Sequence, residues 1–190
     1  MNKKDKAVKV LRIFRKIHRV TGIILFLFFM FIAVTGLLLG WKKHTGGLIL
    51  PETKKGVSKE LSGWLPLDSL EKNSIKYFRE KISGTESVKI DRLDIRPDKG
   101  IVKVVFADNY WEIQADGVTG EVLSAELRWS DFIENLHDAS YLDKVFGVSD
   151  GYIKLIYTSV MGGALLIFTV TGFWLWAGPK RLRKLKKEKE

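Results

Sequence analysis

Two long apolar stretches near the ends of the chain constrain its fold more than any other feature. Residues 20–41 include no charged side chain over 22 residues, and residues 155–179 include none over 25. A helix rises about 1.5 Å per residue, so either stretch can cross a hydrocarbon core of about 30 Å. The first is too long for a cleavable signal peptide and has no small-x-small site after it, so we expect it to stay as an anchor. We predict two transmembrane helices, at residues 20–41 and 153–178.

The charges around these stretches predict how the chain is oriented in a membrane. Residues 1–19 carry eight basic side chains and one acidic one, and residues 178–190 carry seven and two. The rest of the chain holds 17 basic and 19 acidic residues, so the whole positive excess of the net charge of +10 lies at the two ends. Because basic residues favour the cytoplasmic side, we expect residues 1–19 and 179–190 to be cytoplasmic and the middle of the chain to be extracytoplasmic.

The position of the basic groups also excludes some classes of function. Basic residues beside apolar spans attract anionic lipid headgroups, by about 1 kcal/mol each near the surface. Membrane lipid is therefore the expected partner of these residues, and nucleic acid is not. The chain has no cysteine, which excludes disulfides, thiol chemistry and cysteine-ligated clusters.

The periodicity between the spans predicts a small α+β domain within residues 42–128. Apolar residues recur at helical spacing between Pro66 and Gly84. The period then changes to alternation in four segments separated by turns, at residues 88–95, 101–106, 110–114 and 121–127. A helix and a four-stranded antiparallel sheet of about 60 residues lie near the lower size limit for an independent core, so we expect support from a partner copy or the membrane region.

An amphipathic pattern follows the predicted sheet. Apolar residues of 129–146 fall on one helical face, and Gly147 and Gly151 bracket a turn back towards the second span. We predict one outer amphipathic helix and a turn at residues 129–152, lying near the outer membrane interface.

Five short segments in this order resemble a known family. Residues 18–22 read HRVTG at the start of the first span, and residues 34–39 read VTGLLL near its end. Residues 116–122 read DGVTGEV, similar to the D-x-x-T-G-x-V turn of PepSY domains. Residues 136–137 read LH, 34 residues before VTGFWLW at residues 170–176. Together they resemble the PepSY-associated transmembrane family of bacteria over residues 12–180.

This resemblance implies a bacterial inner-membrane protein with a PepSY-like extracytoplasmic domain. Larger family members have four or more spans, and some are haem-containing reductases that act on ferric siderophores. The present chain has two predicted spans and carries Asp138 where the family often has arginine. The resemblance thus implies a link to ferric iron or siderophore reduction, and leaves open whether the chain is itself a reductase component.

Three histidines are the candidate ligands for a cofactor: His18, His44 and His137, all expected at membrane edges. Neutral imidazole supplies a nitrogen ligand without burying a charge, which suits b-type haem. His18 and His44 are 26 residues apart, about 39 Å along a helix, so they cannot share one iron. His44 and His137 are both predicted outside and could. For His18, an interfacial side chain beside Arg19 is the competing interpretation.

Small residues line the same helical face as His18. Gly22 and Gly36 fall within about 40° of it at 100° per residue, and a comparable stripe containing Gly172 runs along the second span. Such stripes permit close helix packing in lipid, or leave room for a flat macrocycle. Thr35 and Thr171 are expected to bond to a carbonyl one turn earlier in their own helices.

A homodimer would complete a bis-histidine site. One chain offers no second cytoplasmic histidine, whereas a two-fold dimer supplies a second His18 within a four-helix bundle. The middle domain shows no catalytic constellation and no phosphate loop. Two functions stay open: haem b electron transfer towards ferric iron or a ferric siderophore, and a non-redox PepSY binding or regulatory module, or accessory subunit, held in a membrane complex. Electron transfer requires the histidines, and the binding module does not.

Overall fold

The computed structural model describes residues 3–84 and 88–187. The chain forms two compact units: a helical unit, Met1–Gly36 with Asn135–Glu190, and a sheet unit, Leu37–Glu134. Residues 1–2 and 188–190 of the predicted cytoplasmic ends, and residues 85–87 of the predicted domain, lie outside the described residues.

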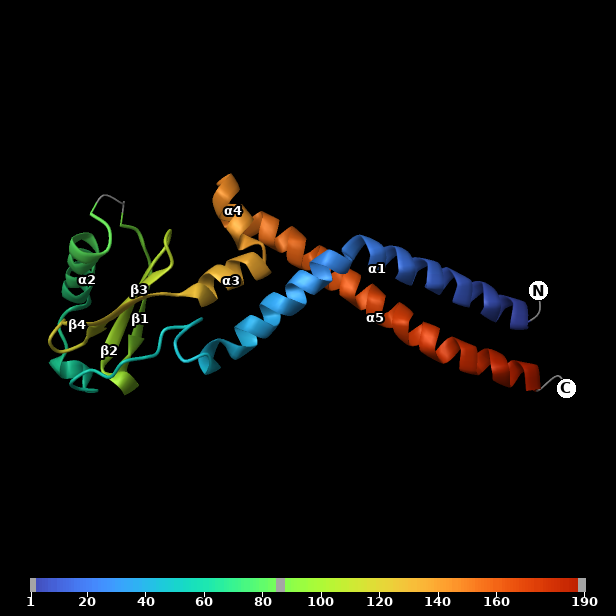
Figure 1. Ribbon diagram of the computed structural model, residues 1–190, viewed down its shortest axis with the longest axis horizontal. Helices are drawn as coiled ribbons and strands as arrows, with labels where there is room; N and C mark the ends of the chain where they lie inside the picture. The colour runs from blue at the N-terminus through green and yellow to red at the C-terminus, as the bar shows by residue number, and fades with distance from the viewer. Residues whose placement is uncertain (1–2, 85–87, 188–190) are drawn as a thin grey trace. The chain divides into compact units, whose positions relative to one another are not determined.

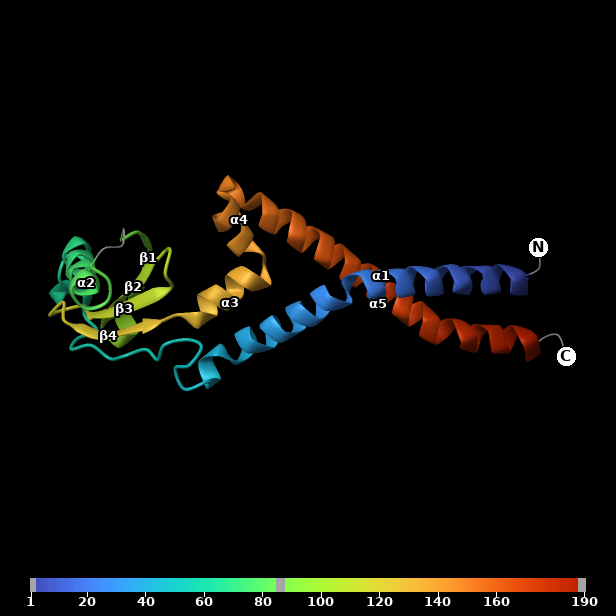
Figure 2. The ribbon, with the colours of Figure 1, turned by 45° about the horizontal axis from the view of Figure 1, so that its top comes forward.

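Two long helices dominate the helical unit. Helix α1 covers Lys3–Trp41 and helix α5 covers Tyr152–Lys187. They run antiparallel, and the start of α1 and the end of α5 lie at the same end of the pair (Figures 1 and 2). Each is long and apolar enough to cross a membrane, in agreement with the two predicted spans. Helix α1 ends at Trp41 as predicted, whereas α5 continues through Pro179 into the second basic segment.

The single amphipathic helix predicted for residues 129–146 is wrong, because the structure has two. Helix α3 covers Trp129–His137 and helix α4 covers Ser140–Phe146. Between them Ala139 adopts a left-handed conformation with φ of 62°. The Asp138 carboxylate accepts a hydrogen bond from the Ser140 amide at 2.9 Å, which gives the start of α4 a local partner. This local bond competes with the continuous helix that the apolar period favours.

A carboxylate from α4 caps the first turn of the second long helix, α5. Asp143 accepts hydrogen bonds from the amides of Ile153 and Lys154, at 2.9 and 3.0 Å. These amides belong to the first turn of α5 and have no partner inside the helix. The chain reaches this turn through Gly147, in a left-handed conformation, and a 3₁₀ turn at Ser149–Gly151, which confirms the predicted turn.

The sheet unit confirms the predicted helix and four-stranded antiparallel meander. Helix α2 covers Leu67–Lys81 and follows Pro66. The strands pair in the order β1-β2-β3-β4, all antiparallel: β1 Ile90–Arg96, β2 Ile101–Phe106, β3 Trp111–Asp116 and β4 Val122–Leu127. Short 3₁₀ turns lie at Lys42–His44, Leu61–Gly63 and Pro97–Lys99. The α+β class predicted from the periodicity is therefore correct.

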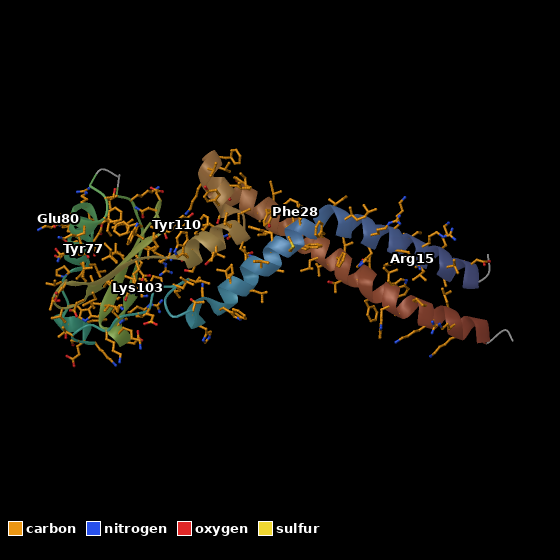
Figure 3. All side chains as sticks on the ribbon, in the orientation of Figure 1. Arg15, Phe28, Tyr77, Glu80, Lys103 and Tyr110 are labelled. Carbon is orange, nitrogen blue, oxygen red and sulfur yellow. The ribbon has the colours of Figure 1, made fainter. Side chains whose placement is uncertain are left out.

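One face of the sheet packs against α2 and forms the hydrophobic core. Alternate residues of β2 and β3 point to this face, as the two-residue period of a strand requires. Phe78 of α2 stacks on Phe106 of β2 with ring centroids 4.6 Å apart. The buried cluster comprises Leu70, Phe78, Val102, Val104, Phe106 and Ile113. Figure 3 shows Tyr77 and Glu80 on α2 and Lys103 in the sheet.

The opposite face buries a charged cluster around Glu112, which is 1% exposed. Lys103 Nζ lies 3.1 Å from one carboxylate oxygen, and Arg128 pairs with the other. Gln114 Nε2 also donates to Glu112, at 2.7 Å. Because each buried charge has a partner, the cluster avoids the cost of an isolated ion.

Residues 49–58, called the strap below, cross this polar face. The Lys54 amide donates to Gln114 Oε1 at 2.8 Å, and Gln114 Nε2 donates to the Glu52 carbonyl at 2.9 Å. The Gly56 amide donates to the Lys99 carbonyl at 2.8 Å. A Cβ at Gly56 would lie 2.0 Å from the Gly100 carbonyl oxygen, so only glycine permits this approach. The strap thus belongs to the fold of the sheet unit.

Asp116 joins the strap to the turn of the DGVTGEV segment. Its carboxylate accepts hydrogen bonds from the amides of Val118, Thr119 and Val57, at 2.8, 2.9 and 2.6 Å. Burial raises the pKa of this carboxyl, but the three amide bonds outweigh burial and hold the pKa below its ordinary value. The aspartate of this motif therefore has a structural role.

Candidate functional site

The helical unit brings two of the three predicted histidines into matching surroundings. His18 of α1 lies beside Thr171 and Gly172 of α5, with His18 Nδ1 2.9 Å from Thr171 Oγ1. The His18 ring stacks on Phe168 with centroids 3.9 Å apart and planes inclined by 24°. We call His18, Phe168, Thr171 and Gly172 the His18 cluster.

His137 forms a second cluster of the same kind. It is the last residue of α3, and its Nδ1 lies 2.7 Å from Oγ1 of Thr35 in α1. Gly36 follows Thr35 and faces the imidazole, because a Cβ there would lie 3.6 Å from His137 Cε1. We call Thr35, Gly36 and His137 the His137 cluster. The two clusters are reciprocal, since α1 supplies the histidine of one and the Thr-Gly pair of the other.

Each threonine hydroxyl lies between an imidazole nitrogen and carbonyls of its own helix. Thr35 Oγ1 lies 2.8 Å from the Phe31 carbonyl, and Thr171 Oγ1 lies 2.7 Å from the Ile167 carbonyl. A hydroxyl has one proton, and a carbonyl can only accept it. The direction of each histidine–threonine bond depends on the tautomer of the ring.

Nε2 is the ring nitrogen of each histidine that the threonine does not contact. Among the residues that the structure describes, neither Nε2 atom has a hydrogen-bond partner. A histidine whose Nδ1–H is held by an oxygen acceptor is the usual arrangement of a metal-ligating imidazole. The two clusters therefore have the donor chemistry that axial ligation of haem iron requires.

The threonines of both clusters are buried within helices that otherwise expose most of their apolar side chains. Thr35 is 6% exposed and Thr171 is 3% exposed. His18 and His137 are half-buried. The threonines were expected to bond to their own helix carbonyls, and this is confirmed. Their contacts with the histidines were missed, as was the stacking of Phe168.

The clusters lie at different levels of α1. His18 and Thr35 are 17 residues apart, which corresponds to about 25 Å along the helix axis. His18 and His137 therefore cannot ligate the same iron within one chain. Thr35 lies six residues before the end of α1, so His137 contacts α1 about 9 Å inside that end.

Glycines provide the space for these rings. A Cβ at Gly172 would lie 3.4 Å from His18 Cε1, and one at Gly22 would lie 3.1 Å from Phe168 Cε2. Gly40 and Gly162 have no such neighbour within 4 Å among the described residues. The predicted small-residue stripes thus accommodate aromatic side chains at Gly22, Gly36 and Gly172. A cofactor contact at Gly22 and Gly36 stays a prediction.

Two apolar grooves lie in the helical unit. One of about 420 Å³ lies between α1 and α5, with Val20 and Ile167 in its lining, and includes no member of the His18 cluster. Another, of about 470 Å³, includes the neighbours of His137 at Leu136 and Ala139. Both are lined mainly by apolar side chains, which suits a flat hydrophobic macrocycle. The two imidazoles thus have the donor chemistry that haem requires, and the apolar grooves have the lining that suits a macrocycle, but neither histidine is part of a groove lining.

Asp138 follows His137 and is neutralised by Lys154, whose Nζ lies 2.5 Å from its carboxylate. Burial raises the pKa of Asp138, but bonds from Lys154 and Ser140 outweigh it and keep the carboxyl below its ordinary pKa. The charge next to the candidate ligand is thus balanced locally.

His44 has different surroundings. It ends the short 3₁₀ turn Lys42–His44 of the sheet unit, and its side chain is exposed. No threonine contacts its ring among the described residues. Its predicted pairing with His137 stays a prediction. Within residues 3–84 and 88–187, no three histidine or acidic side chains gather in a way that could hold a metal ion.

Comparison with known protein families gives one match that covers most of the chain. The family model described as the PepSY-associated TM region matches residues 15–190, which include both histidine clusters and the whole sheet unit. A comparison with curated proteins gives no match. The chain is therefore a membrane protein that belongs to the PepSY-associated transmembrane family.

Proposed function

We propose that this protein is a haem b electron-transfer protein of the bacterial inner membrane, used in the reduction of ferric iron or ferric siderophores. In this proposal both termini are cytoplasmic and the sheet unit is extracytoplasmic. The basic ends of the chain support this orientation.

The observation that carries the proposal is the pair of reciprocal clusters. Each presents an imidazole whose Nδ1 is hydrogen-bonded to a buried threonine, with Nε2 without a hydrogen-bond partner among the described residues. Such ligands at two levels about 25 Å apart suit a path that runs across a membrane. When bound, haem would supply one-electron exchange between ferric and ferrous iron.

The residues of this chain would hold the haem in an apolar, water-poor region. His18 and His137 would ligate iron through Nε2, and the aromatic and aliphatic side chains of the grooves would exclude water. Each electron taken from a one-electron donor on the cytoplasmic side would reduce one Fe(III) outside to Fe(II). The ferric iron or siderophore is the substrate in this proposal.

A homodimer would supply the second axial ligand at each level. Each chain has one clustered histidine per level, so a two-fold axis would pair His18 with the partner's His18 and His137 with the partner's His137. This resulting four-helix bundle is an arrangement that holds cofactors between facing helices. His44 remains a third candidate ligand near the outer surface.

A second candidate function is a membrane-anchored binding or regulatory module. Its support is that the sheet unit has its own buried core and its own paired polar cluster. In that case the histidine clusters would serve only to join α1 to α5 and α3.

Optical spectra of the protein and its histidine variants test the choice. Protein from haem-replete cells, purified in mild detergent, should give a dithionite-reduced minus oxidised spectrum with the α-band of bis-histidine b haem. His18→Ala and His137→Ala should each lower the haem content, and Thr158→Val, as the control outside both clusters, should retain it. His44→Ala tests the third candidate ligand separately. A wild type without a Soret band would refute the proposal, as would unchanged haem in both cluster variants.

A further inference from the structure

We propose that Thr35 and Thr171 are positioning residues that fix His137 and His18 as Nδ1–H tautomers, so that Nε2 is the donor atom at both levels. This inference rests on the proposed function in one respect, the identity of the group that Nε2 would bind. The tautomers are inferred from the carbonyl acceptors that each threonine hydroxyl has in its own helix.

The proton of each threonine hydroxyl has acceptors in its own helix. Thr35 Oγ1 lies 2.8 Å from the Phe31 carbonyl and 3.2 Å from the Ile32 carbonyl, and both carbonyls can only accept. Thr171 Oγ1 has the same pair of acceptors, Ile167 at 2.7 Å and Phe168 at 3.0 Å. In each case the hydroxyl proton is directed at the backbone, and the lone pair is left for Nδ1–H.

The histidine position is fixed together with its tautomer. The imidazole is held at Nδ1 by the threonine, and the next residue is a glycine whose missing side chain leaves room for Cε1. In the His18 cluster Phe168 also stacks on one face of the ring. A hydroxyl that accepts from Nδ1–H raises the basicity of Nε2, which strengthens its bond to a metal.

Interhelical adhesion is the competing role, because polar bonds also join helices in lipid. Adhesion alone requires a hydrogen bond of either polarity. The positioning role requires the specific tautomer, and it predicts that each threonine affects only its own histidine. These two roles therefore differ in a measurable way.

The chain offers matched controls for this test. Thr158 and Thr169 of α5 donate to carbonyls four residues earlier, both at 2.8 Å, and both are exposed. Neither contacts a histidine among the described residues. Thr158→Val and Thr169→Val thus remove the same hydroxyl from the same kind of helix without altering a cluster.

Nitrogen NMR of haem-free protein tests the tautomers without relying on activity. In protein labelled with ¹⁵N-histidine and held in detergent at neutral pH, the wild type should show His18 and His137 as Nδ1–H tautomers, with His18→Ala and His137→Ala giving the assignments. Thr35→Val should redistribute the proton of His137 alone, and Thr171→Val that of His18 alone. Serine at either position should restore the wild-type signal, because it keeps the hydroxyl.

The haem-loaded protein supplies the second readout. Thr35→Val and Thr171→Val should each weaken haem retention about 10- to 100-fold at one level and raise the midpoint potential of that haem, while the two control variants change neither. Wild-type histidines protonated at Nε2, or valine variants that leave tautomer and potential unchanged, would overturn the inference. A haem-free wild type with both Nδ1–H tautomers would refute the proposed function and leave the tautomer assignment standing.

Discussion

The two compact units differ in how they place their large apolar side chains. The sheet unit buries Leu70 and Phe78 against its strands. The helical unit exposes most of its large apolar side chains and buries the polar Thr35 and Thr171. In water the apolar residues are driven inside, whereas in lipid the surroundings are as apolar as leucine, and packing and hydrogen bonds must join the helices. The comparison teaches that exposure has opposite meanings in the two units.

Removing one large aromatic side chain from each unit should give the largest contrast. Phe78→Ala empties a site that is 1% exposed and stacked on Phe106, so it should destabilise the sheet unit by about 3–5 kcal/mol. Phe26→Ala removes the same side chain from an exposed position on α1 and should cost far less. Thermal unfolding of the full chain in detergent measures both. Equal losses would contradict the contrast.

An aspartate introduced at equally exposed positions should also have different effects in the two units. Met30 of α1 is 55% exposed and Leu61 of the sheet unit is 56% exposed. Met30→Asp lies near the middle of the first span and should disfavour membrane insertion by about 2.5–3.5 kcal/mol. Leu61→Asp faces water and should change stability by less than about 0.5 kcal/mol. Carbonate extraction of membranes reports insertion, and an unaffected Met30→Asp would show that α1 does not face lipid there.

Acid should weaken the sheet unit through Asp116. The pKa of this carboxyl is lower in the folded chain than its ordinary value, so its stabilisation is complete above about pH 4 and is lost as the pH falls through the folded pKa. Asp116→Asn should lower the melting temperature at pH 6 and flatten its fall between pH 5 and 3. Burial raises the pKa of Asp131, but Arg92 and Arg128 help to hold it below its ordinary value. The Asp116→Asn variant should therefore keep part of the acid dependence. Identical pH profiles for wild type and variant would contradict the role of Asp116.

Threonine bonds in the helical unit should give the smallest change in stability. Hydrogen bonds between membrane helices average about 0.6 kcal/mol, so Thr35→Val should lower the unfolding free energy by about that amount. Thr169→Val keeps every interhelical contact and should be neutral. Stability of the purified protein against sodium dodecyl sulfate measures both. A loss of several kcal/mol in Thr35→Val would indicate that the cluster is mainly a structural joint.

Much of the fold follows from local patterns. Three patterns predicted the right elements: the 22-residue apolar run, the helical period after Pro66 and the alternation of residues 101–106. Each pattern depends only on side chains that are near one another in sequence. The break at Ala139 was missed because the apolar period continues across it. The Asp138–Ser140 hydrogen bond at this break is a local polar contact, which the period of apolar residues does not report.

The candidate site was only half predictable. His18, His137, Gly22 and Gly36 could be selected by residue type and helical angle. The partners Thr171 and Phe168 could not, because they lie about 150 residues from His18 in sequence and only packing brings them together. A usable signal did exist, since each clustered histidine contacts a Thr-Gly pair of a span, Thr35-Gly36 in the first and Thr171-Gly172 in the second. Reading those pairs as partners of the histidines would have found both clusters.

The haem-to-chain ratio of the wild-type protein tests the central claim most directly. Protein from haem-replete cells is purified in mild detergent, and its haem is counted as the pyridine haemochrome against chain concentration. The proposed dimer holds two haems, one at each level, and each haem is ligated by one histidine from each chain. The account therefore predicts one haem b per chain, with a bis-histidine spectrum. A ratio near zero under these conditions would contradict the account and leave the sheet unit as the functional part.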